Sequence, residues 1–131
     1  RFAASPTPGS FSADEEINQA TTGAVGKVVE YDSTNRILYY IQTRFNDEGA
    51  DSNGNKTAFS GANVVTGQGG GSPTGTPDTS FSSTVNGASF TSGYSASELD
   101  ADSGDIMYLE QRAPITRATD QTENVKLVVE F

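Results

Sequence analysis

The carboxyl-terminal run at residues 125–131 restricts the fold more than any other part of the sequence. Its odd-numbered residues, from Val125 to Phe131, are all apolar, and the charged residues Lys126 and Glu130 stand between them. A period of two is typical of a β-strand with one buried face. Because a free tail would not end on a large apolar side chain of that face, we expect this end of the chain to be docked in a sheet.

The composition favours a small β core with long loops. Only 34% of the 131 residues are hydrophobic, and glycine, serine, threonine, asparagine and aspartate are abundant. Strong helix formers such as leucine, lysine and methionine are few. We therefore predict a mainly β fold, a β-sandwich or a partly open barrel, with long Gly/Ser/Thr-rich loops and little helix. The length predicts one β domain over residues 11–131. Residues 1–10, rich in proline and serine, are predicted as an extended arm or linker.

A hairpin is the clearest local element. Residues 26–31 and 36–43 are rich in β-branched and aromatic side chains, and the polar residues 32–35 between them suit a turn. The second strand carries an unbroken apolar run, Ile37–Ile41, without alternation. Such a run is typical of a strand that is covered on both faces, so we expect it to be central in its sheet.

The segment before the hairpin is ambiguous. Ser12 followed by Glu15 resembles a capping box, which favours a short helix. The alternative is a short strand at residues 16–20, and we favour the strand because a hairpin follows it.

The middle of the chain has weaker signals. Residues 59–66 and 89–94 suggest marginal strands. Residues 67–77 are rich in glycine and proline, so we predict an irregular loop there.

The charge of the chain argues against nucleic acid and membranes as partners. It has 17 acidic and 8 basic residues, a formal net charge of −9. Proteins that bind nucleic acid use lysine and arginine to neutralise phosphates, and anionic membranes attract the same residues. We expect the acidity to serve solubility and the choice of protein partners instead.

Side chains for the common catalytic sites are missing. The sequence contains no histidine and no cysteine, which removes histidine-dependent triads and the usual ligands of zinc and iron–sulfur clusters. Carboxylate chemistry needs two converging acids, and no pair stands out. We predict that the protein is not an enzyme and holds no cofactor. A small carboxylate-dependent enzyme is kept as an alternative.

One acidic turn has part of the pattern of a calcium-binding loop. Asp51, Asn53 and Asn55 present side-chain oxygens at alternate positions. A calcium loop of the EF-hand type then needs glycine at its sixth position and glutamate at its twelfth, where this chain has Lys56 and Ala62. We therefore predict a solvated turn with Asx hydrogen bonds and no metal.

A glycan-binding or adhesin-type β-sandwich is a further alternative. The adjacent Tyr39 and Tyr40, the acidic turns and the Gly/Ser/Thr-rich loops would suit such a module. Adjacent residues of a strand point to opposite faces of the sheet, so the two rings cannot form one stacking platform. Core packing of one tyrosine and an interface contact of the other is the simpler interpretation.

The segment from Arg112 to Arg117 carries the main interface signal. Pro114 removes a backbone donor and favours extended geometry before it, and two arginines flank the apolar Ile115. Arginine and apolar anchors are enriched in protein interfaces. We predict Arg112, Ile115 and Arg117 as protein-contact residues. An ordinary β connection with solvated arginines is the alternative.

The same region resembles a known family. The run from Ser103 to Phe131 contains Gly104-Asp105 before a strand with Tyr108, then Arg112-x-Pro114-Ile115-x-Arg117, then Asp120-Gln121-x-Glu123 and a last strand that ends in an aromatic residue. In these motifs it is similar to the carboxyl-terminal end of the baseplate wedge subunit, gene product eight, of T-even-type contractile-tailed phages.

The resemblance implies a structural, non-enzymatic component of a phage tail baseplate, a β scaffold that holds neighbouring wedge proteins in fixed geometry. It implies contacts with other baseplate or tail proteins and a homodimer. It also implies a place in the virion tail baseplate after assembly in the host cytoplasm. Because members of that family are longer than this chain, residues 11–131 are expected to be the carboxyl-terminal part of a longer subunit.

Overall fold

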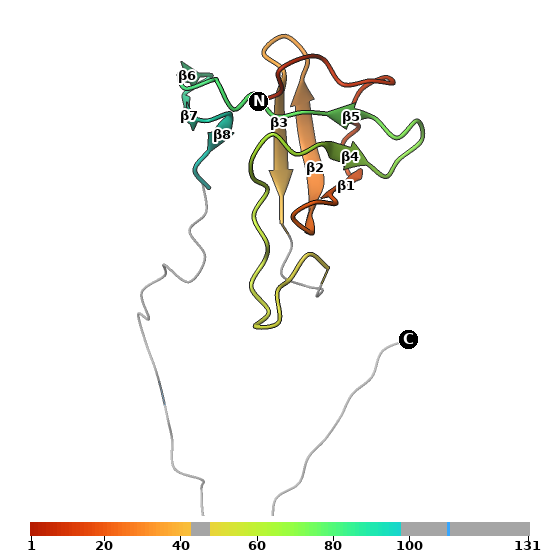
Figure 1. The fold of residues 1–131 in the computed structure, drawn as a ribbon, viewed down its shortest axis with the longest axis vertical. Coiled ribbons are helices and arrows are strands. Elements are labelled where there is room, and N and C mark those ends of the chain that lie inside the picture. The colour runs from red at the N-terminus through yellow and green to blue at the C-terminus, as the bar shows by residue number, and fades with distance from the viewer. Residues whose placement is uncertain (43–47, 98–109, 111–131) are drawn as a thin grey trace, which may run out of the picture. The chain divides into compact units, whose positions relative to one another are not determined.

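The computed structural model describes residues 1–42, 48–97 and Glu110. Residues 1–98 form a compact unit with eight strands (Figure 1), and residues 99–131 form a second unit. Within the described ranges the regular elements are all strands and none is a helix, which confirms the prediction of a mainly β fold with little helix. The strand predicted at 125–131 lies outside the described residues.

Five antiparallel strands form a sheet that curls into a half-barrel (Figure 1). They are β1 (Glu16–Gln19), β2 (Ala24–Asp32), β3 (Ile37–Ile41), β4 (Val65–Gly67) and β5 (Thr74–Gly75). Their order across the sheet is β3-β2-β1-β4-β5, so β1 is central. The predicted hairpin is confirmed as β2 and β3. The irregular loop predicted at 67–77 is interrupted by β5, whose Gly75 pairs with Val65.

The strand β3 is an edge strand of the described sheet, so the prediction that it is central is wrong. The apolar residues of this strand have different environments. Ile37 is buried and Leu38 packs against the core, whereas Ile41 is 50% exposed. The unbroken apolar run therefore reflects partial cover of the second face and not a place in the middle of the sheet.

The segment before β1 uses the capping-box side chains in a turn and not in a helix. The Ser12 backbone N–H donates to Glu15 Oε2 (2.9 Å), and the Glu15 N–H donates to the Ser12 carbonyl oxygen (3.2 Å). A helix cannot continue, because Asp14 has a φ of 65°. The chain instead enters β1, as predicted. Glu15 Oε1 accepts a hydrogen bond from the Gly69 N–H (2.8 Å) and so ties the β4–β5 loop to this turn.

A small three-stranded meander follows the sheet in sequence. Its strands are β6 (Thr84–Val85), β7 (Ala88–Thr91) and β8 (Tyr94–Ser95), paired in this order. Two-residue turns connect them, Asn86-Gly87 (φ of 52° and 80°) and Ser92-Gly93 (φ of 51° and 81°). Positive φ at both central residues is typical of the type I′ turn, whose twist matches that of a hairpin. The single strand predicted at 89–94 is therefore wrong in its limits, since a turn falls inside it.

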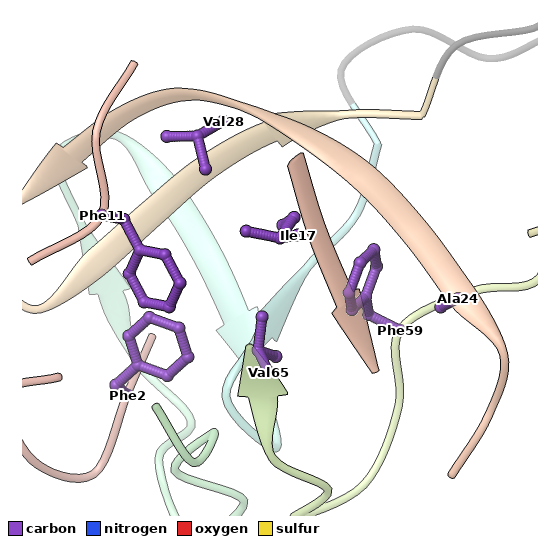
Figure 2. Packing of buried hydrophobic residues seen from close by; sticks show 7 residues of the cluster. All are labelled: Phe2, Phe11, Ile17, Ala24, Val28, Phe59 and Val65. Carbon is purple, nitrogen blue, oxygen red and sulfur yellow. The ribbon is translucent and has the colours of Figure 1, made fainter. Parts of the chain in front are cut away.

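The hydrophobic core lies against the inner face of the five-stranded sheet. Its buried residues are Phe2, Phe11, Ile17, Ala24, Val28, Phe59 and Val65 (Figure 2). The rings of Phe2 and Phe11 stack with centroids 5.5 Å apart. Phe2 brings the amino-terminal segment into the core, and this segment also forms β-bridges between Phe2 and Pro77 and between Thr7 and Thr74. The predicted limits of an arm at 1–10 and a domain at 11–131 stay a prediction.

One polar side chain is fully buried beside this core. Gln19 of β1 donates from Nε2 to the Asn63 carbonyl oxygen (2.8 Å). Its Oε1 accepts from the Ser60 N–H (2.9 Å) and from Thr22 Oγ1 (2.8 Å). Gln19 therefore joins the central strand to the connection between β3 and β4, and its hydrogen bonds replace those that water would make.

Replacing Gln19 with leucine is expected to lower the free energy of unfolding by about 1–2 kcal/mol, because the Ser60 N–H and the Asn63 carbonyl oxygen lose their hydrogen bonds to the buried amide. Urea unfolding followed by circular dichroism measures the change. Gln68→Leu is the matched control, since Gln68 is exposed and its replacement should leave the midpoint nearly unchanged. Equal midpoints for both variants would contradict the structural role of Gln19.

Candidate protein-interaction surface

The contact residues predicted from the sequence, Arg112, Ile115 and Arg117, lie outside the described residues. The described part of the chain offers a different candidate, the face of the β2–β3 hairpin that is turned away from the core.

The register of the hairpin identifies this outer face. Val28 of β2 is buried in the core, and its neighbours Lys27 and Val29 are exposed. Lys27 is paired with Ile41. Beyond a bulge at Val29, Glu30 is paired with Tyr39. The next pair, Tyr31 and Leu38, packs against the core. Side chains alternate between faces along a strand, so these exposed positions and Tyr39 share the outer face.

The turn between β6 and β7 covers one end of the outer face. Asn86 Nδ2 donates to Asp32 Oδ2 (3.0 Å) and to the Tyr39 hydroxyl oxygen (3.4 Å). Ile37, which is paired with Asp32, is buried although it is not part of the core cluster.

The other end of the outer face is open. Val29 is 53% exposed and Ile41 is 50% exposed. We call Val29, Tyr39 and Ile41 the outer strip. Exposed apolar side chains that share one face of an edge hairpin are a candidate surface for contact with another protein. The sequence indicates an interface contact for one of Tyr39 and Tyr40, and the structure places Tyr40 against the core residue Phe59 and Tyr39 in this strip. The exposed Ile41 is not predicted, because an unbroken apolar run is typical of a strand that is covered on both faces.

A cleft of about 380 Å³ lies where the meander meets β3. Its walls consist of Tyr39, the segment from Asn86 to Ser89 and the segment from Ser95 to Ser97. Among these described lining residues none is charged. Its asparagine and serine side chains distinguish the cleft from the apolar Val29 and Ile41 at the open end of the outer strip.

The carboxylate of Asp32 holds the covered end together. Its Oδ1 accepts from the N–H groups of Thr34 (2.9 Å) and Asn35 (3.1 Å), and its Oδ2 accepts from the side chain of Asn35 (2.7 Å) as well as from Asn86. These hydrogen bonds, above all that from the Asn35 side chain, hold the pKa of Asp32 below its ordinary value. The ionised carboxylate thus fixes both the β2–β3 turn and the meander.

A second cleft, of about 300 Å³, shows mixed charge. Its lining residues are Asp14, Glu16, Val25, Gly26, Lys27, Glu48 and Lys56. Lys27 Nζ lies 3.3 Å from Asp14 Oδ1. A general acid would need a carboxyl group with a raised pKa. Where the pKa of a described carboxyl group is displaced, at Asp32, Asp51 and Asp78, hydrogen bonds lower it. The described residues therefore lend no support to the carboxylate-enzyme alternative.

The acidic turn at Asp51 forms the Asx hydrogen bonds predicted for it. Asp51 Oδ1 accepts from the N–H groups of Asn53 (2.8 Å) and Asn55 (2.9 Å). In the part of the chain that the structure describes, no three acidic side chains gather in a way that could hold a metal ion. Nor do residues 1–42 and 48–97 include a helix long and apolar enough to cross a membrane.

Comparison with known protein families gives a match over part of this chain. Residues 77–131 match the family model Phage-Gp8, described as Bacteriophage T4, Gp8. The match confirms the resemblance to gene product eight and supports a structural component of a phage baseplate. It spans the meander and begins at Pro77, the bridge partner of Phe2. No curated protein and no solved structure matches the chain.

Acid is expected to destabilise the protein through Asp32. Because its folded-state pKa lies below the ordinary value of 3.8, the stabilisation is complete above that value and is lost as the pH falls through the folded-state pKa. Asp32→Asn removes the charge, so the melting temperature of the variant should be lower at neutral pH and should fall less between about pH 5 and about pH 2. Parallel curves of melting temperature against pH for the variant and the parent would contradict this role.

Proposed function

We propose that the chain is a non-enzymatic scaffold of a phage tail baseplate, which holds neighbouring wedge proteins in fixed geometry. The match of residues 77–131 to Phage-Gp8 carries this proposal. The proposed location is the baseplate of the virion tail, reached after assembly in the host cytoplasm. The proposed partners are other baseplate or tail proteins and a second copy of the chain, without nucleic acid or membrane.

The hydrogen bonds within the described unit support the proposal that it is a rigid scaffold. Long connections around a small sheet are tied to it by single side chains: Glu15 holds the β4–β5 loop, Gln19 holds the connection before β4, and Asp32 holds the meander. A scaffold that transmits geometry between neighbours needs such fixed loops, because loops carry most contacts between proteins.

Two surfaces are proposed for the protein contacts. One consists of Arg112, Ile115 and Arg117, which the sequence indicates. The other is the open end of the outer strip, where Val29 and Ile41 present apolar area at the edge of the described sheet. An apolar anchor surrounded by polar groups suits a specific and stable contact.

The location is tested by labelling purified virions with antibodies against the 131-residue chain and by electron microscopy. Label at the tail baseplate is expected. Virions that lack the chain in both labelling and mass spectrometry would overturn the proposal.

The contact surface is tested by charge substitution. Ile41→Lys should weaken binding to purified baseplate wedges that lack this chain by about tenfold or more, since an apolar anchor is replaced by a charge. Val64→Lys is the matched control, because Val64 is 48% exposed but lies outside the outer strip. Undiminished binding by Ile41→Lys would remove the outer strip from the interface. The same assay with Arg112→Ala and Arg117→Ala tests the second surface independently.

A further inference from the structure

The cleft between the meander and β3 has no part in the proposed scaffold contacts. We propose that it binds a saccharide unit without net charge. The cleft shares Tyr39 with the outer strip, but the proposed contact anchors Val29 and Ile41 are not among its lining residues.

The lining of the cleft suits a sugar ring. Tyr39 offers an aromatic side chain, and Asn86, Ser89 and Ser95 carry small groups that donate and accept hydrogen bonds. A sugar has one face of C–H groups, which packs on an aromatic ring, and a rim of hydroxyl groups, which pair with amides and hydroxyls. The two alanines of the lining leave room beside these groups.

Other ligand classes fit less well. A phosphate or a nucleotide needs cations, and none of the described lining residues is charged. A large apolar ligand needs apolar walls, which Tyr39 and two alanines cannot supply. A charged side chain of a partner protein would find no opposite charge among the same lining residues. The described lining residues are best matched to a neutral ligand with many hydroxyl groups.

The polar groups are fixed before a ligand arrives. Asn86 Nδ2 is held between Asp32 and Tyr39, and its backbone is fixed by the type I′ turn. Within the described part of the chain, no hydrogen bond uses the Oδ1 atom of Asn86. Ser89 Oγ lies 3.2 Å from Thr84 Oγ1, which fixes a second hydroxyl. Groups that are ordered in the free protein lose little entropy on binding.

The volume also fits. At about 380 Å³, the cleft lies near the lower end of the range of small-molecule sites, which is roughly 300–1,000 Å³. A single saccharide unit of a longer glycan suits this size, with the rest of the glycan in solvent.

The test uses the full 131-residue chain. Binding is screened on an array of immobilised bacterial oligosaccharides, and ¹⁵N-labelled protein is titrated with the methyl glycosides of glucose, galactose, mannose and N-acetylglucosamine. We expect saturable shifts of amide signals at Tyr39, at residues 86–89 and at residues 95–97 for at least one probe. No array signal together with no saturable shift would overturn the proposal, as would shifts confined to other residues.

Variants separate binding from folding. Tyr39→Ala should weaken the bound glycoside by about tenfold, whereas Tyr39→Phe keeps the ring and should stay within about threefold. Ala96→Trp should fill the cleft and abolish binding, and Val64→Trp is the matched surface control. Melting temperatures show which variants are folded. An unchanged affinity for the glycoside in a folded Ala96→Trp protein would overturn the proposal. It would also be overturned if the parent protein bound no saccharide and Tyr39→Ala lost its binding to the wedge proteins.

Discussion

The structure of the described unit depends on hydrogen bonds from buried side chains around the central strand. Gln19 lies in β1 and Glu15 comes directly before it, and each holds a connection that is distant in sequence. The core has few large apolar side chains, so burial of apolar area alone would leave the long loops free. Each of these side chains accepts a hydrogen bond from a backbone N–H group of a loop. These hydrogen bonds hold the loops against the sheet.

The described residues 77–97, which lie within the match to Phage-Gp8, are not separate from the rest of the first unit. Pro77 forms a bridge with Phe2, and Asp78 lies 2.5 Å from the guanidinium of Arg1. Asn86 is bonded to Asp32 across the outer face of the hairpin. The half-barrel sheet, which lies before the matched residues, therefore supports the meander that lies within them. In this chain the two form one packed structure.

The sequence predicted those features that have a strong local period or a strong local turn. The β2–β3 hairpin was found because β-branched residues flank a polar turn, and β1 because that hairpin needed a neighbour. The central position of β3 was wrong, since an apolar run does not reveal which neighbour covers it. The meander was missed because its outer strands have two residues each, although Asn86-Gly87 is a strong hairpin signal. The cleft could not be predicted, because it joins Tyr39 to residues more than forty positions later.

The bridge between Phe2 and Pro77 has a consequence for the order in which the chain acquires its structure. A ribosome makes the amino-terminal segment first, yet its ring can reach its final place only after a stretch of 75 further residues has emerged. Until then the stacked rings of Phe2 and Phe11 are not fully buried. Pairings over such a sequence distance are slow to form, so the nascent protein carries an exposed Phe2 ring at least until Pro77 has emerged.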